Sequence, residues 1–161
     1  QDFDLGPLIS KKQVIMVQKY LNLGSDLKKI VELKLNEKLE NGSFIAPTLF
    51  GMVDPNHALA QEEIFGPIQV LIPFDDEEDA IKIANGTKFG LVAGIWTSDG
   101  SRQLRMAKKI KAGQVFINNY GAGGGVELPF GGTGHSGYGR EKGLEALNSF
   151  STIKTIAINH G

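Results

Sequence analysis

The sequence predicts an α/β fold built around a parallel sheet. Between residues 68 and 119, three short apolar segments alternate with two segments of helical periodicity, and only a few residues join each to the next. Strands and helices in this order favour a parallel sheet that is covered by helices. The chain of 161 residues, 41% of them hydrophobic, is long enough to bury the core of about one domain.

The first half predicts a helix, an ambiguous segment and a strand. The helix follows Ser10, whose side chain suits an N-cap, and ends at Gly24. Residues 26–40 fit either a helix or a half-buried strand, because their apolar positions satisfy both periodicities. Asn41-Gly42 marks a turn, and residues 44–53 then predict a strand that a proline interrupts.

The second half predicts three strands separated by two helices. The helix over residues 75–85 begins with acidic side chains and the helix over residues 99–111 ends with lysines, and the helix dipole stabilises both charge distributions. The strands are expected over residues 68–74, 91–97 and 115–119.

The C-terminal part is rich in glycine. Eleven of the 21 glycines lie between Gly113 and Gly143, and residues 120–139 show no periodic element. A loop of this length in a compact domain is either functional or a wrongly assigned segment. A short helix is expected over residues 141–147, and Thr152 to Ile158 form a β-prone segment near the end of the chain.

Composition and charge exclude several classes of protein. With 17 basic and 18 acidic residues the net charge is −1, so the sequence does not predict a basic surface for nucleic acid. No apolar run approaches the ~20 residues of a membrane-spanning helix, because two prolines and a glycine interrupt the longest, residues 64–74. The absence of cysteine excludes disulfides, thiolate nucleophiles and cysteine-ligated metals within the chain. We therefore expect no nucleic acid and no membrane as partners.

Two weaker signals favour structural interpretations. Residues 132–137 match the string G-x-G-x-x-G, but no strand directly precedes them and no acid lies about 20 residues further on, so a tightly folded loop is favoured over a dinucleotide site. The histidines (His57, His135 and His160) lie far apart without metal-ligand spacing, and we interpret them as surface residues. No metal site is predicted.

A more specific signal lies in residues 61–67, where two carboxylates adjoin an aromatic residue and a Gly-Pro turn just before a predicted strand. A glutamate at this place could accept two hydrogen bonds from a ribose diol, while the ring of Phe65 packs on a base. A surface helix would explain Glu62 and Glu63 but not Phe65. From the residues alone, both interpretations stay open.

A series of motifs then occurs in one order: L-G-P-L-I-S at residues 5–10, E-E-I-F-G-P at 62–67, F-G-L at 89–91, P-F-G-G at 129–132, S-G-Y-G-R-E at 136–141 and K-T at 154–155. With these motifs the chain resembles the C-terminal part of an NAD(P)-dependent aldehyde dehydrogenase over nearly its whole length. The resemblance implies an α/β, parallel-sheet catalytic domain, truncated at its N-terminal side, over residues 1–150. It also implies an oligomerisation strand, a C-terminal β arm, over residues 151–161.

The resemblance further implies how the cofactor, NAD or NADP, is held. Glu63 is similar to the residue that binds the nicotinamide-side ribose, and Phe65 is similar to the aromatic residue beside it.

For the aldehyde substrate, the resemblance implies that Phe130 forms a wall of the substrate tunnel, with Asn118, Asn119 and Tyr120 leading toward it. Glu141 is similar to a carboxylate that in some members passes protons toward the catalytic base. A structural role for Glu141 is an equal alternative.

The resemblance also implies what the chain lacks. In the family a cysteine thiolate attacks the aldehyde to form a thiohemiacetal, hydride passes to the nicotinamide, and a glutamate activates the water that releases the carboxylic acid. The nucleophile, the glutamate and the cofactor-binding portion belong upstream of Leu5, and the chain begins at Gln1 without a methionine. We therefore expect this piece to be inactive alone, to need the missing N-terminal portion as a partner and to expose apolar surface.

Family members usually carry a glycine pair near residues 35–36, and its absence weakens the strand prediction for residues 30–35. Residues 121–125 occupy a position that varies with substrate. We expect a cytoplasmic protein, and a homo-oligomer that forms through residues 152–158. The alternatives are a non-catalytic, self-associating interaction module and a piece of a CoA-acylating semialdehyde dehydrogenase.

Overall fold

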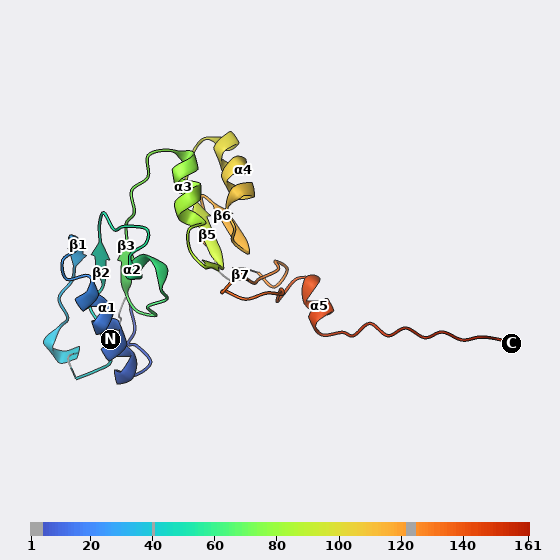
Figure 1. Cartoon of the computed structure of the whole chain (residues 1–161). Coiled ribbons are helices and arrows are strands. Elements are labelled where there is room, and N and C mark those ends of the chain that lie inside the picture. The colour runs from blue at the N-terminus through green and yellow to red at the C-terminus, as the bar shows by residue number, and fades with distance from the viewer. Residues whose placement is uncertain (1–4, 40, 122–124) are drawn as a thin grey trace. The chain divides into compact units, whose positions relative to one another are not determined.

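The computed structural model describes residues 5–39, 41–121 and 125–161. Within it the chain divides into two compact units, residues 1–75 and residues 76–161. Figure 1 traces the elements of both units along the chain.

The described residues of the first unit form two helices, three strands and one turn of 3-10 helix. In chain order these are α1 (Lys11–Leu23), β1 (Lys29–Glu32), the 3-10 turn (Glu37–Leu39), β2 (Thr48–Phe50), α2 (Ala58–Gln61) and β3 (Ile68–Val70). The predicted helix is confirmed, because the Ser10 side chain caps α1 by accepting a hydrogen bond from the backbone N–H of Gln13. Within the ambiguous segment 26–40, the described residues form a strand followed by the 3-10 turn.

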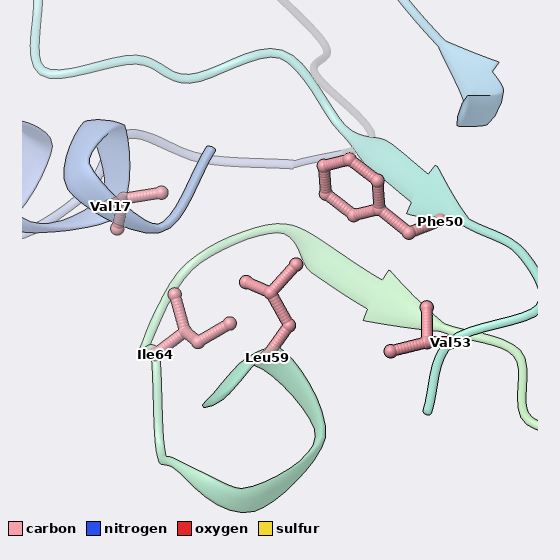
Figure 2. Packing of buried hydrophobic residues seen from close by; sticks show 5 residues of the cluster. All are labelled: Val17, Phe50, Val53, Leu59 and Ile64. Carbon is pink, nitrogen blue, oxygen red and sulfur yellow. The ribbon is translucent and has the colours of Figure 1, made fainter. Parts of the chain in front are cut away.

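The sheet of the first unit has the order β1-β2-β3. Strand β1 runs antiparallel to β2 with a bulge between Lys29 and Val31, whereas β3 runs parallel to β2 with Ile68 opposite Thr48. Five buried side chains from α1, α2 and the strands with their flanking loops point toward one another in the core (Figure 2): Val17, Phe50, Val53, Leu59 and Ile64.

The second unit alternates helices and strands. Its elements are α3 (Glu77–Ala84), β4 (Phe89–Gly90), β5 (Val92–Ile95), α4 (Gly100–Lys109), β6 (Gln114–Ile117), β7 (Thr133–Gly134) and α5 (Glu145–Ser149). The two predicted helices are confirmed, because Asp76 and Asp99 cap them by accepting hydrogen bonds from the backbone N–H groups of Asp79 and Arg102. The Glu77 carboxylate joins α3 to α4 by binding the guanidinium groups of Arg102 and Arg105.

The prediction of one parallel sheet is only partly right. In the second unit β5 and β6, which α4 connects, pair in parallel as the sequence predicts, and in the first unit β3 pairs in parallel with β2. The described residues also contain two antiparallel pairs, β1–β2 and β4–β7. Apolar runs predict where strands lie but not which strand each one pairs with, so the antiparallel pairs could not be predicted from the sequence.

The short C-terminal helix begins four residues later than predicted, at Glu145 instead of 141. Glu141 is held in a β-bridge with Phe130, and Lys142 and Gly143 have φ values of 61° and 58°. These left-handed backbone conformations are incompatible with a right-handed helix, so α5 cannot start before them.

The expected C-terminal strand is not formed within this chain. Residues 151–161 have neither helical nor strand structure and are exposed, and Figure 1 shows them as an extended trace beyond α5. A strand acquires its hydrogen bonds only from a neighbouring strand, and in the described part of the chain none pairs with this segment. Pairing with a second copy stays a prediction. Among the described helices the longest, α1, has 13 residues, and none could cross a bilayer.

Candidate functional site

The residues expected to bind the cofactor lie on a short loop between α2 and β3. Glu63 and Phe65 are both exposed, and Phe65 has 73% of its surface free. Phe65 has a left-handed backbone with φ of 52°. A bulky residue rarely adopts this conformation, and such strain is concentrated at functional sites. The loop therefore presents an aromatic ring and a carboxylate to solvent at an energetic cost.

Helix α1 holds this loop in place through two side chains. The Gln13 amide Nε2 donates hydrogen bonds to the carbonyl oxygens of Ile64 at 2.9 Å and Phe65 at 3.3 Å. Further along the helix, the Tyr20 hydroxyl donates to Oε2 of Glu62 at 2.6 Å. These bonds fix the backbone of the loop and the carboxylate of Glu62, both of which would be mobile in a loop without such contacts.

Val17, in the middle of the same face of α1, packs against Gly66 of the loop. A Cβ atom at Gly66 would lie 2.6 Å from Cγ2 of Val17, so only glycine allows this close approach. Gln13, Val17 and Tyr20 are spaced by four and three residues and thus share one helix face. Gln13 and Tyr20 were not predicted from the sequence as residues of the site, although this spacing was the signal that could have found them.

The two adjacent glutamates have different surroundings. Glu62 accepts the Tyr20 hydrogen bond, and this bond, with burial and the negative charge of Glu62, raises the pKa of the Tyr20 hydroxyl. In the part of the chain that the structure describes, no hydrogen bond or ion pair engages the carboxylate of Glu63. Both oxygens of the Glu63 carboxylate are consequently available to accept hydrogen bonds from a ligand.

A second group of expected site residues follows β6. Asn118 has a φ of 50°, and its side-chain amide makes two hydrogen bonds to the backbone of Thr97. Its Oδ1 accepts from the N–H of Thr97 at 2.9 Å, and its Nδ2 donates to the Thr97 carbonyl at 3.0 Å. Asn119 accepts from the N–H of Tyr120, which is 72% exposed. The side-chain amide of Asn118 therefore links the ends of β5 and β6. The exposed ring of Tyr120 is the group of this segment that can contact a ligand.

The third group consists of Phe130 and Glu141, which the structure brings together. The N–H of Phe130 donates to the Glu141 carbonyl at 2.6 Å, and the N–H of Glu141 donates to the Phe130 carbonyl at 2.7 Å. The Lys142 ammonium lies 5.5 Å from the centre of the Phe130 ring. Both residues line a hollow of about 410 Å³ together with Tyr138, Arg140 and other side chains. Glu141 thus has a structural backbone role and an exposed carboxylate.

The glycine-rich loop over residues 132–137 is tightly folded with positive φ values, as predicted. Gly134 and Gly137 have φ values of 61° and 109°, and a Cβ at Gly132 would lie 2.4 Å from the Cβ of Ser136. The segment contains β7 and does not open a helix, which a dinucleotide loop requires. Of residues 121–125, those at 122–124 lie outside the described residues.

The histidines have local structural surroundings. His57 caps α2, since its Nδ1 accepts from the N–H of Leu59 at 3.1 Å, and His135 packs edge-on against Phe89. His160 lies in the exposed C-terminal segment. Within the described ranges, no group of three or more acidic residues or histidines could hold a metal ion.

Comparisons of the sequence and of the fold with known proteins identify relatives of this chain. A sequence model described as the aldehyde dehydrogenase family matches residues 1–156. The NADP/NAD-dependent aldehyde dehydrogenase PuuC of Escherichia coli is 50% identical over 115 residues, which cover 71% of this chain and 23% of that protein. The betaine aldehyde dehydrogenase of Sinorhizobium fredii is 38% identical over 164 residues, which cover 98% of this chain and 33% of that protein.

A solved structure agrees in fold. The crystal structure of Mycobacterium tuberculosis aldehyde dehydrogenase complexed with NAD+ is 40% identical, and it superposes with a TM-score of 0.89 over 98% of this chain and 32% of that one. The chain thus spans about a third or less of the length of these relatives. The 161 residues have the sequence and the α/β structure of one portion of this enzyme family, and the chain belongs to the aldehyde dehydrogenase family.

Proposed function

We propose that this chain supplies part of the cofactor site and part of the substrate tunnel of an enzyme that oxidises an aldehyde to a carboxylic acid with NAD+ or NADP+. The observation that carries the proposal is the loop on which Glu63 and Phe65 are exposed while α1 holds the backbone beneath them. Family membership supports the reaction type, and the names of the relatives associate them with NAD+ and NADP+.

The residues of the loop fit the nicotinamide half of such a cofactor. The carboxylate of Glu63 can accept hydrogen bonds from both hydroxyls of a ribose, and the exposed Phe65 ring offers an apolar face beside it. When bound there, the cofactor would supply the hydride acceptor of the reaction. The role of this chain is to orient the ribose and to exclude water on the side of Phe65.

On the aldehyde side, Phe130 would form a wall of the tunnel, with Asn118, Asn119 and Tyr120 leading toward it. The free Glu141 carboxylate at the hollow suits a proton relay, whereas its backbone bridge suits a structural role. The chain has no cysteine. The nucleophile that forms the thiohemiacetal must come from a portion outside these residues, so the chain alone should not turn over aldehyde.

The proposal includes the partners and the location. Residues 152–158 would pair with another copy in a homo-oligomer, the N-terminal cofactor-binding portion of the same enzyme would complete the site, and the protein would be cytoplasmic.

The test is reconstitution of activity. The chain is assayed for NAD(P)H production with a panel of aldehydes, first alone and then mixed with the N-terminal portion of the E. coli relative. We expect no turnover alone and turnover in the mixture, which Glu63→Gln should weaken by roughly tenfold or more at limiting cofactor. Glu78→Gln, which removes an exposed acid on α3, is the matched control. Turnover by the chain alone, or equal activity of the two variants, would contradict the proposal.

The exposed C-terminal segment favours one other function, a self-associating interaction module. Ile153, Ile156 and Ile158 are 100%, 75% and 69% exposed, and an unpaired apolar segment of this kind can add to the edge of a sheet. Light scattering on the chain alone, with and without residues 151–161, tests this function independently of activity.

A further inference from the structure

The sequence contains two Asn-Gly pairs that are chemically alike and structurally different, Asn41-Gly42 and Asn85-Gly86. Asparagine followed by glycine is the dipeptide in which the backbone nitrogen of the second residue reaches the side-chain amide of the first most readily, because glycine has no Cβ to hinder the approach. The other asparagines precede larger residues. The structure decides which of the two pairs can react.

The Asn85-Gly86 pair is held on both sides of the reacting bond. Asn85 caps the C-terminus of α3, its Nδ2 donates to the Lys109 carbonyl at 2.9 Å, and its Oδ1 accepts from the N–H of Lys111 at 2.7 Å. The N–H of Gly86 donates to the Ile83 carbonyl. The side chain must lose both bonds before its carbon can turn toward the Gly86 nitrogen.

The Asn41-Gly42 pair lies in a turn in which Asn41 is exposed and Gly42 is half-buried. Asn41 is exposed, and across the described ranges no hydrogen bond holds its side chain. The N–H of Gly42 donates to the Leu39 carbonyl at 2.8 Å, so the turn must open for the reaction. Only a three-residue 3-10 turn precedes it, and short exposed turns open far more readily than a helix end that is anchored by a side chain.

We infer that Asn41 is a site of spontaneous deamidation and isoaspartate formation, and that Asn85 is protected by its two side-chain hydrogen bonds. The Gly42 nitrogen attacks Cγ of Asn41, the new C–N bond closes a five-membered succinimide, and the Cγ–N bond breaks. Ammonia leaves with the proton that the Gly42 nitrogen gives up. Water then opens the ring at either carbonyl and yields aspartate or isoaspartate. This modification site does not depend on the proposed function.

The modification alters a turn that supports the start of α1. The Gly42 carbonyl accepts from the Lys11 ammonium at 2.6 Å, and the Ser43 carbonyl accepts from the N–H of Leu8 at 2.7 Å. Isoaspartate inserts the side-chain methylene of Asn41 into the main chain immediately before these two carbonyls. The bond from Leu8 should therefore weaken, and its amide should exchange with solvent faster in the modified chain.

The test is peptide mapping by mass spectrometry of the 161-residue chain after incubation at mildly alkaline pH, on samples whose circular dichroism shows intact helices. Deamidation at Asn41 should be faster than at Asn85 by roughly tenfold to a hundredfold, because the two side-chain hydrogen bonds of Asn85 must break before it can react. The same chain unfolded in urea is the control, in which the two rates should become similar.

A second measurement and a variant complete the experiment. Enzymatic detection of isoaspartate should find it at residue 41. Asn41→Gln should remove this signal and leave the rate of deamidation at Asn85 unchanged. Equal rates at the two sites in the folded chain would overturn the inference. So would an Asn41 that stays intact in the folded chain while the unfolded chain reacts.

Discussion

Because Phe65 has a left-handed backbone, Phe65→Gly should be more stable than Phe65→Ala, the reverse of the order expected within a helix. A φ of 52° costs a residue with a Cβ atom about 1–2 kcal/mol, whereas glycine adopts it freely. Phe65 is 73% exposed, so removal of its ring sacrifices little buried surface. Phe65→Gly should therefore be more stable than Phe65→Ala by about 1 kcal/mol, after allowance for the greater freedom of glycine in the unfolded chain.

The measurement is urea unfolding of both variants, with helix α1 as the internal reference. With an m-value of about 1–3 kcal/mol/M, the midpoints should differ by roughly 0.3–1 M. Lys19 is exposed within α1, and Lys19→Gly should be less stable than Lys19→Ala by about 1 kcal/mol. If the Phe65 pair follows the order of the Lys19 pair, the backbone at residue 65 is unstrained and the loop is not held against its conformational preference.

The remaining predictions concern the contacts around this loop and between α3 and α4. Gln13→Leu should lower the free energy of unfolding by about 1–3 kcal/mol, because two carbonyls lose their donor, and amide exchange should accelerate at Ile68, whose N–H donates to the Gly66 carbonyl of the same loop. Gly66→Ala should cost about 1–3 kcal/mol by overpacking against Val17, and Val17→Ala in the same chain should recover part of this loss in a double-mutant cycle. The hydrogen bond from Arg105 lowers the pKa of Glu77 from 4.5 to about 2. Because the folded-state pKa is depressed, the stabilisation is present above pH 4.5 and is lost as the pH falls toward 2, and urea midpoints of Glu77→Gln should show a weaker acid dependence in this range.

The helices were predictable because their signals are local. Ser10, Asp76 and Asp99 each cap a helix through their own side chain, so a few neighbouring residues contain all the information. The start of α5 was not predictable, because a β-bridge to Phe130, eleven residues upstream of Glu141, overrides the local helical preference. The same limit applies to the sheets, whose partners are chosen by contacts between distant segments.

The candidate site could be predicted in part. The motif predicts the roles of Glu63 and Phe65, which stay predictions, and the structure leaves both side chains exposed. The engagement of Asn118 with the backbone of Thr97 could not be foreseen, since 21 residues separate them and the contact depends on how β5 and β6 pair. The contribution of Gln13 depends in the same way on a contact that spans 51 residues.

The small number of buried side chains has a calorimetric consequence. The described residues include six buried hydrophobic side chains, and five of them belong to the core of the first unit, which leaves Ile95 in the second. The heat-capacity increment of unfolding arises from apolar surface that becomes hydrated, at about 12–15 cal/mol/K per residue in ordinary globular proteins. A chain in which so few apolar side chains are fully buried should fall below that value and melt over a wide temperature range, with the second unit melting first.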